Sequence, residues 1–334
     1  MQSIQLQGNE TLACIDIPAP RPGPGQVLIE TRLSALCGSE LKAYRGAGME
    51  DGNSGHEAAG IIAELGAGVT HLQQGQRVGI SAIAGCGQCP YCDRGQNTWC
   101  PDRVYHGSMH AERFLTSAQA CHPLPDDLSW EAGVLISGDG FGVPYHTSTK
   151  LLNEPIERVA VFGLGPIGLG NTMMQTHLGR QVIAIDIAPY RLDLARQLGA
   201  AHTIQADNGQ NVVAQVRALT HGLGPDVCLE AAGRPETAAQ CFAAVRTGGT
   251  VVFNGEQGPL QLSPSDHFIR RDITALGSWY YHFGQFAAML KLYRAGLAID
   301  RLITHHFPFA QAAEAFRLMA AGKTGKVVLH YGTD

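Results

Sequence analysis

Arg158-Val-Ala-Val-Phe-Gly-Leu-Gly-Pro-Ile-Gly-Leu-Gly170 is the stretch of the 334-residue chain that decides its fold. It begins with a short apolar run typical of a strand and continues with glycines in the order GxGxxG. A helix-length segment follows, and then Gln181-Val-Ile-Ala-Ile-Asp186, a second apolar run closed by an acid. This order predicts a dinucleotide-binding unit: a strand, a glycine-rich turn, a helix and a second strand that ends in an acid.

The three glycines of this motif have different physical roles. Gly163 makes the tight turn out of the strand, Gly165 lets the backbone approach a pyrophosphate, and Gly168 lets the helix pack close to the sheet. Asp186 lies 21 residues after Gly165, where a carboxylate can bind ribose hydroxyls. A 2′-phosphate would meet a like charge there, so NAD is favoured over NADP, although Arg191 is near enough to leave NADP open.

The N–H groups at the helix start are expected to face the phosphates, and Ala231 is expected to lie beside the nicotinamide at the carboxyl edge of the sheet. The alternative is a glycine-rich turn without a ligand, which the strand, helix and acid in register disfavour. The predicted cofactor-binding residues are Gly163, Gly165, Pro166, Ile167, Gly168, Asp186, Ile187, Arg191 and Ala231.

Length and composition restrict the class of protein. The chain is long enough for two domains, each with its own core. Its 24 basic and 29 acidic residues give a net charge of −5 without charge runs, so neither a nucleic-acid nor a membrane partner is expected. No apolar stretch is long enough to span a bilayer, and the first residues do not form a signal peptide. We expect a cytoplasmic globular protein.

Four cysteines lie close together in one glycine-rich loop. Cys86, Cys89, Cys92 and Cys100 have the spacing CxxCxxCx7C. Four thiolates around one ion form a closed tetrahedral site, which is structural and not catalytic. Two disulfides, which the expected compartment disfavours, and an iron–sulfur cluster are the alternatives.

Four further candidate metal ligands are scattered through the first part of the chain. Cys37, His56 and Glu57 lie beside apolar strand-like runs, and these residue types bind zinc when a fold brings them together. Asp139 follows an apolar run and sits between two glycines, where a metal would neutralise its charge. Buried packing of the first three residues and an exposed turn at Asp139 are the alternatives.

The order of predicted elements divides the chain into three parts. Strands are predicted at Ser3–Leu6 and Gln26–Leu33, separated by a proline-rich loop, and a short helix is predicted to begin near Cys37. From about 157 to 273 strands alternate with helices, which predicts a parallel, doubly wound sheet. Helices over 189–199, 236–245 and 286–293, a helical segment over 309–319 and a final strand after Gly325 are also expected.

These landmarks together resemble the zinc-dependent medium-chain alcohol and polyol dehydrogenases nearly end to end. The landmarks are Cys37-Gly-Ser, Gly55-His-Glu, the four clustered cysteines, Val161-Phe-Gly-Leu-Gly-Pro-Ile-Gly, Leu198-Gly-Ala and Lys323-Thr-Gly-Lys-Val-Val. The resemblance implies a doubly wound (Rossmann) NAD-binding domain at 145–278. It also implies a β-rich, GroES-like catalytic domain formed by 1–144, with a structural zinc lobe at 85–101, and by a return segment at 279–334.

The resemblance also implies residue roles. Two zinc ions are expected, one catalytic on Cys37, His56 and Asp139, with Glu57 as a direct or intermittent ligand, and one structural on the four cysteines. Ser39, which could instead cap a helix, would hydrogen-bond the substrate oxygen. Glu40 would hold His56 by its far ring nitrogen. Lys42 stands where many relatives have a relay histidine, so protons would leave from Ser39 to water, with Tyr44 or His110 assisting.

The implied reaction is hydride transfer between a secondary alcohol or polyol and NAD, or the reverse reduction. A threonine-type amino-alcohol dehydrogenase and a non-catalytic NAD-binding protein are the alternatives. The resemblance suggests a homo-oligomer, a dimer or a tetramer. The substrate pocket is the least determined part, because its candidate residues could equally be packing residues; they are His110, Phe141, Trp279 and Tyr280.

Overall fold

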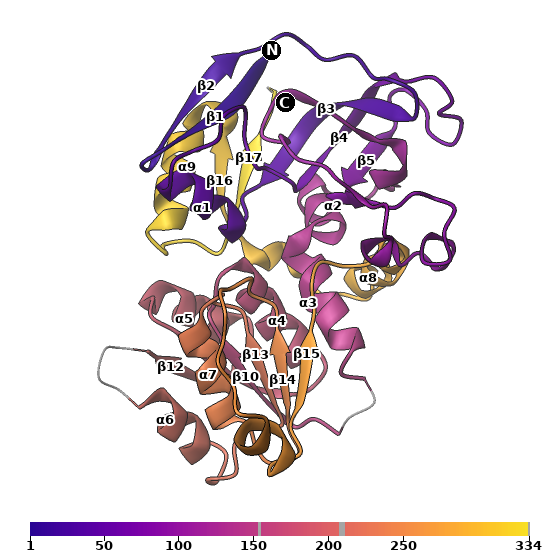
Figure 1. Cartoon of the computed structure of the whole chain (residues 1–334). Helices are drawn as coiled ribbons and strands as arrows, with labels where there is room; N and C mark the ends of the chain where they lie inside the picture. Colours follow the sequence, from indigo (N-terminus) through magenta and orange to yellow (C-terminus); the bar gives the residue numbers. More distant parts are fainter. Residues whose placement is uncertain (153–154, 207–210, 333–334) are drawn as a thin grey trace. The chain divides into compact units, whose positions relative to one another are not determined.

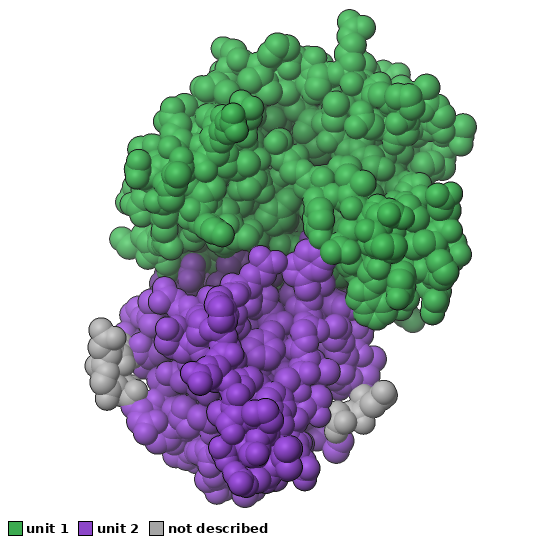
Figure 2. Space-filling view, viewed as in Figure 1, with its two compact units in different colours: residues 1–142, 281–334 green, residues 143–280 purple. Residues whose placement is uncertain are grey.

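The computed structural model describes residues 1–152, 155–206 and 211–332, and the chain divides into two compact units (Figure 2). Unit 1 comprises Met1–Gly142 and Tyr281–Asp334, and unit 2 comprises Val143–Tyr280. Unit 2 is therefore inserted into the chain of unit 1. The boundaries expected from the sequence, after residues 144 and 278, lie two residues from these.

Unit 2 is built on a parallel sheet whose strands lie in the order β12-β11-β10-β13-β14-β15 (Figure 1). Every neighbouring pair in this order is parallel. The chain moves outward from β10 to β12 and then returns past β10 to β13, so strand order reverses at β10, where ligands bind in doubly wound folds. The predicted doubly wound sheet is confirmed. Its strands are β10 (Arg158–Phe162), β11 (Gln181–Asp186), β12 (His202–Gln205), β13 (Val227–Glu230), β14 (Thr250–Phe253) and β15 (Thr274–Gly277).

The helices that connect these strands begin where the sequence favours helix initiation. Proline is the first residue of α4, α5 and α7, a position where its missing N–H costs nothing. The predicted helices at 189–199 and 236–245 correspond to α5 and α7. The helical segments of this region are α3 (Asp139–Thr149), α4 (Pro166–His177), α5 (Pro189–Gln197), α6 (Val212–Ala218), α7 (Pro235–Ala244) and the π-helical turn η5 (Pro264–Ile269).

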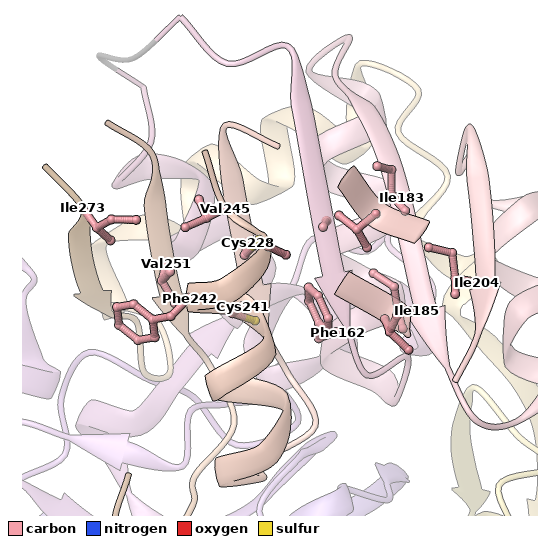
Figure 3. Packing of buried hydrophobic residues seen from close by; sticks show 14 residues of the cluster. Phe162, Ile183, Ile185, Ile204, Cys228, Cys241, Phe242, Val245, Val251 and Ile273 are labelled. Carbon is pink, nitrogen blue, oxygen red and sulfur yellow. The ribbon is translucent and has the colours of Figure 1, made fainter. Parts of the chain in front are cut away.

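Both faces of this sheet are buried. Ala160, Phe162, Ile183 and Ile185 join side chains of α6 and α7 in one apolar cluster (Figure 3). Val159, Val161, Val182 and Ala184 alternate with them along β10 and β11, and each is fully buried as well. Because successive side chains of a strand point to opposite faces, helices must cover the sheet on both sides, which is why its strands read as continuous apolar runs.

Unit 1 is dominated by a mainly antiparallel sheet in the order β16-β17-β3-β4-β5-β9, with β8 paired to β3. The hairpin β1–β2 and the pair β6–β7 are separate. β2 was not expected from the sequence, because its residues are at least partly exposed and form no buried apolar run. The strands are β1 (Gln2–Gly8), β2 (Thr11–Asp16), β3 (Gln26–Ala35), β4 (Ala58–Leu65), β5 (Arg77–Ile80), β6 (Ile83–Ala84), β7 (Val104–Tyr105), β8 (Arg113–Ser117), β9 (Cys121–Pro123), β16 (Ile303–Pro308) and β17 (Lys326–His330).

The first and last parts of the chain share one core in unit 1. Ile4, Leu6 and Leu36 pack in the same apolar cluster as Phe316 and Leu329. This shared core is the physical reason why the return segment belongs to unit 1. None of the described helices is long and apolar enough to cross a membrane. The α-helices of unit 1 are α1 (Leu41–Arg45), α2 (Trp130–Ser137), α8 (Phe286–Arg294) and α9 (Ala312–Ala320).

Short 3₁₀ turns complete unit 1. One of them, η1 (Gly38–Glu40), leads directly into α1, as expected for a short helix beginning near Cys37. The others are η2 (Cys92–Arg94), η3 (Asn97–Trp99), η4 (Ala118–Ala120), η6 (Phe283–Gln285), η7 (Ile299–Leu302) and η8 (Phe309–Gln311).

Candidate active site

Four scattered side chains of unit 1 converge. Cys37, His56, Glu57 and Asp139 each offer one ligand atom, and these atoms all lie within 4.8 Å of one another. Cys37 follows β3, His56 and Glu57 directly precede β4, and Asp139 is the first residue of α3. The paired strands β3 and β4 therefore present three of the groups at one edge, and the break between α2 and α3 supplies the fourth.

The distances within this cluster suit a shared cation. Asp139 Oδ2 lies 3.2 Å from His56 Nε2 and 3.6 Å from Cys37 Sγ. The other ring nitrogen, His56 Nδ1, is 2.8 Å from the Ser54 carbonyl oxygen, so Nε2 is the atom that faces the cluster. Asp139 Oδ1 is buried and has no hydrogen-bond partner in the described part of the chain. A buried carboxylate oxygen without a donor is costly unless something positive binds it.

The charges of the cluster act on one another strongly. Burial opposes the charged form of His56, but the nearby Cys37 and Asp139 raise its pKa well above the ordinary value. Burial likewise opposes ionisation of Asp139, but the hydrogen bond and charge of His56 lower its pKa. The side chains of His56 and Asp139 remain 19% and 15% exposed.

Glu57 differs from the other three because it already has a buried cation as partner. Its Oε1 forms an ion pair with Lys326 Nζ, and both side chains are almost fully buried. Its Oε2 accepts the Gly140 N–H at 3.1 Å. Burial raises the pKa of the Glu57 carboxyl, and Lys326 acts against that shift. Glu57 therefore belongs to the cluster, but its two carboxylate oxygens already have partners without an ion.

Glu40 does not hold His56, so this prediction is wrong. Glu40 Oε1 accepts the Cys37 N–H at 2.9 Å, and Oε2 lies 2.8 Å from His110 Nε2. The tight turn of η1 folds the Glu40 carboxylate back onto Cys37, and the Ser54 carbonyl takes the place at His56 Nδ1 instead. Burial is the largest single influence and raises the pKa of Glu40, but the charge and hydrogen bond of His110, the charge of His56 and the Cys37 N–H together outweigh it, so the net shift is downward.

The four clustered cysteines also converge, on a loop at the surface of unit 1. Their sulfur atoms lie within 4.8 Å of one another, and Cys89 Sγ is 3.5 Å from Cys92 Sγ. A disulfide would need about 2.05 Å, whereas sulfurs 2.3 Å from one tetrahedral ion are roughly 3.8 Å apart. All nine cysteines of the chain are free thiols, so the disulfide alternative does not hold.

Two thiols of this loop differ in their acidity. Backbone N–H groups around Cys92 are the main reason why the pKa of Cys89 falls to about 7. Burial is the main reason why the pKa of Cys92 rises to about 12. Their mutual hydrogen bond favours one thiolate over two, and a cation is needed for all four to ionise together.

The glycine-rich turn of unit 2 has the geometry that its sequence requires. Gly163 has φ +88°, and a Cβ there would lie 2.6 Å from the Ala232 nitrogen. A Cβ on Gly168 would lie 1.8 Å from the Gly163 carbonyl oxygen. A Cβ on Gly165 would meet nothing within 4 Å, so the space beside the start of α4 is open, as a pyrophosphate site needs.

The other predicted cofactor residues surround this turn. Pro166 and Ile167 open α4, and Asp186 ends β11. Asp186 is buried; its Oδ2 accepts the Leu164 N–H at 2.6 Å and its Oδ1 the Ala188 N–H at 2.8 Å. A carboxylate can accept about four hydrogen bonds, so Asp186 keeps capacity for ribose hydroxyls. Ile187 is 71% exposed, Arg191 lies in the first turn of α5, and Ala231 follows β13.

The comparisons with known proteins agree on one family. Residues 23–126 match the alcohol dehydrogenase GroES-like domain, and residues 166–295 match the zinc-binding dehydrogenase family. The chain is 32% identical to YphC of Escherichia coli, described as an uncharacterised zinc-type alcohol dehydrogenase-like protein, with 99% of each chain covered. The chain belongs to the zinc-dependent medium-chain alcohol dehydrogenase family. It is an oxidoreductase that acts on CH–OH groups, as the sequence analysis predicted.

Other relatives of this dehydrogenase are named for their substrates. It is 31% identical to sorbitol dehydrogenase of Gallus gallus, over 93% of this chain and 91% of that one. It is 29% identical to L-threonine 3-dehydrogenase of Xanthomonas oryzae, over 98% of both. Among solved structures, alcohol dehydrogenase TADH from Thermus sp. ATN1 aligns with a TM-score of 0.87, 29% identity and 99% coverage of both chains.

Several residues around the dehydrogenase site were not recognised, or were misjudged, from sequence. Lys326 belongs to a recognised landmark, but its ion pair with Glu57 joins positions 269 residues apart. His110 lies between Glu40 and Ser34, whose Oγ is 2.8 Å from His110 Nδ1 and 2.9 Å from Tyr331 Oη. No spacing signals such a network.

Most of the suggested pocket and relay residues are buried. Phe141 and His110 are fully buried and Tyr280 nearly so, whereas Trp279 is 41% exposed. Tyr44 is buried against Phe316, with ring centroids 5.3 Å apart. Ser39 and Lys42 are exposed in η1 and α1, and Cys37, not Ser39, is the cap residue of η1.

Glu230, at the carboxyl end of β13, was also missed. It is fully buried, and its Oε1 accepts the N–H groups of Ala232 and Gly233, each at 3.0 Å. Burial is the main reason why its pKa is raised. Glu230 thereby fixes the turn after Ala231, one of the predicted cofactor contacts. An acid ending a buried strand, as Asp186 also does, was the signal available in the sequence.

Proposed function

We propose that this dehydrogenase transfers hydride between a secondary alcohol or polyol and NAD at a catalytic zinc. Cys37, His56 and Asp139 would hold the ion, with Glu57 as an intermittent ligand. A second, structural zinc would be held by Cys86, Cys89, Cys92 and Cys100. The observation that supports this most is the convergence of four ligand-type side chains from separate elements within 4.8 Å.

The residues fit zinc by their chemistry. A thiolate, an imidazole nitrogen and carboxylate oxygens are its usual protein ligands. Asp139 Oδ1 is buried and no described residue donates a hydrogen bond to it, and a cation would satisfy it. When bound, zinc would act as a Lewis acid and lower the pKa of a hydroxyl, as it lowers that of water from about 15.7 to about 7, which is on the order of 12 kcal/mol.

The protein's own groups would orient the site and move the proton. Ser39 is exposed two residues after Cys37, and its hydroxyl can both accept and donate a hydrogen bond. It would therefore take the substrate proton and pass it to solvent. Lys42 is exposed and cationic, so it can only donate and cannot accept that proton. Glu40 would act by fixing the Cys37 backbone, because it contacts the Cys37 N–H.

NAD would bind at the turn between β10 and α4. The helix start offers N–H groups to the pyrophosphate, and the open space at Gly165 leaves room for it. Asp186 would accept the ribose hydroxyls and repel a 2′-phosphate. Ile187, exposed beside Asp186, would contact the adenine. Arg191 and Ala231 would complete the contacts.

A secondary alcohol or polyol is the substrate class that the ligands and relatives support best. Asp139 in place of a second thiolate makes the metal centre harder, and the sorbitol dehydrogenase relative acts on a polyol by its name. The threonine relative has a slightly lower identity over a similar length.

A substrate panel tests this proposal. Purified protein with its native zinc is given sorbitol, other polyols, simple secondary and primary alcohols, and threonine, and NADH formation is followed by absorbance with NAD and with NADP. We expect the highest kcat/KM for a polyol or secondary alcohol with NAD. Highest kcat/KM for threonine would contradict the substrate class. No turnover of any alcohol would contradict the catalytic role.

A further inference from the structure

A third group of metal-ligand side chains lies in unit 1, apart from the two already described. Glu131, His306 and His330 each offer one ligand atom within 4.8 Å of the others. We propose that these residues form an additional binding site for a divalent transition ion of the Zn²⁺ type. This proposal does not depend on the catalytic role of Cys37, His56 and Asp139.

The fold places the two histidines side by side. β16 and β17 are parallel neighbours, with His306 opposite Val328 and Pro308 opposite His330. Alternate residues of a strand share a face, so Val328 and His330 point the same way, and His306 joins them through its pairing with Val328. The two imidazole rings are stacked, with centroids 5.2 Å apart. Glu131 approaches from the first turn of α2.

The spacing of the ring nitrogens is close to that of a chelating pair. His306 Nδ1 and His330 Nε2 are 2.9 Å apart and share one hydrogen bond. Two nitrogens bound at 2.0–2.1 Å to one tetrahedral ion are about 3.3–3.4 Å apart. The rings therefore need to separate by roughly 0.4 Å while their shared proton leaves, which is a small rotation for the exposed His306.

The donor set selects the class of ion. Imidazole suits zinc, copper and nickel, whereas magnesium and calcium prefer sites made of oxygen ligands. Two nitrogens and one carboxylate leave a position open to water. A second carboxyl group lies near Glu131: burial raises the pKa of Asp300, and the charge of Glu131 raises it further.

An ion in this position would connect segments that are far apart in the chain. Glu131 opens α2, whose end leads to Asp139, while the histidines belong to the return segment. Binding would therefore stabilise unit 1 by linking its two chain parts, because an ion that binds only the folded state raises its stability. Affinity would fall below about pH 6, where histidine is protonated and no longer a ligand.

Calorimetric titration with Zn²⁺ tests the site on tag-free protein that retains its native zinc. Wild type is compared with His306→Gln, His330→Gln and Glu131→Gln. His305→Gln is the matched control on the same strand, because the His305 ring stacks on Phe307 and lies outside the ligand group. Removing a partner that only orients a ligand costs about 10- to 100-fold in metal affinity, so losing a direct ligand should cost at least that.

The expected result is one additional Zn²⁺ bound by wild type and by the control, with proton release that differs between buffers. Each of the three ligand variants should lose this event, and added Zn²⁺ should no longer raise its midpoint of thermal unfolding. Binding that is unchanged in both histidine variants would overturn the proposal. So would a wild-type titration that shows no additional ion.

Discussion

The four-cysteine site and the candidate catalytic site of unit 1 both bring their ligands together, but by opposite routes. The four cysteines come from a single loop of fifteen positions, with identical ligands and a surface location. Cys37, His56, Glu57 and Asp139 come from three places up to 102 residues apart, with mixed ligands, and two of the four are buried. The local loop can only hold an ion, because four thiolates close the coordination shell. The scattered set would leave a position for substrate, because Glu57 is already paired with Lys326 and only three ligands would hold the ion throughout.

This contrast predicts that loss of a ligand has different consequences at the two sites. Asp139→Ala should lower kcat by more than the roughly 100-fold that loss of an orienting partner costs, because Asp139 is expected to contact the ion itself. NAD binding, measured by fluorescence titration, should persist, because Asp139 lies in unit 1 and the glycine-rich turn in unit 2. Retained turnover would remove Asp139 from the catalytic site.

Cys92→Ser is the matched change at the other site. One bound zinc should be lost, with part of the roughly 10–16 kcal/mol that a structural zinc contributes in small domains. At about 2–4 °C per kcal/mol for a unit of this size, a loss of about 3 kcal/mol lowers the midpoint of thermal unfolding by roughly 6–12 °C. kcat at a temperature where the variant is folded should change far less than in Asp139→Ala. An equal fall in kcat would break the contrast.

Lys326→Met sharpens the contrast within the catalytic set. It leaves the buried Glu57 carboxylate without its cation, and breaking one side of a buried ion pair costs about 3–5 kcal/mol. The double change Glu57→Gln with Lys326→Met should recover most of that loss, because no buried charge remains. Denaturant unfolding of both variants measures this, and additive losses would show that the pair is not coupled.

The effect that is smallest near neutral pH concerns acid stability. Burial lowers the pKa of His122 to about 3, whereas an unfolded histidine titrates near 6.5. Between these pH values the unfolded chain binds more protons, so this group makes the unfolding free energy fall with falling pH, by up to about 1.4 kcal/mol per unit.

His122→Phe should remove that contribution. The His122 ring stacks between Phe283 and Phe286, so phenylalanine is a suitable replacement. The slope of unfolding free energy against pH between 6.5 and about 3 should be shallower in the variant than in wild type. Parallel slopes would show that His122 does not titrate in this way.

What could be predicted from the sequence follows the same division between features that are local in the chain and features that join distant residues. The cysteine loop and the glycine-rich turn could be recognised because the chemistry needs fixed spacings over a few residues. The doubly wound sheet followed from apolar runs and proline-initiated helices, since both faces of β10 and β11 are buried. The convergence of Cys37, His56 and Asp139 was expected only through resemblance to a family, because distant ligands have no spacing rule.

What escaped prediction depends on side-chain direction at close range. Glu40 was expected at His56, but the tight η1 turn directs its carboxylate to the Cys37 backbone and to His110. Lys326 is the first residue of β17 and Tyr331 directly follows it. Their partners, Glu57 and Ser34, lie in the first part of the chain. Such contacts require the strand register, which no local pattern determines.

The central claim is that Cys37, His56 and Asp139 hold a zinc ion. An anomalous difference map from crystals grown without added zinc, with diffraction recorded on both sides of the zinc absorption edge, tests it most directly. We predict a peak about 2.3 Å from Cys37 Sγ and about 2.0–2.1 Å from His56 Nε2, with Asp139 oxygen in contact, besides one among the four cysteines. A peak at the cysteines with none at Cys37 would contradict the account.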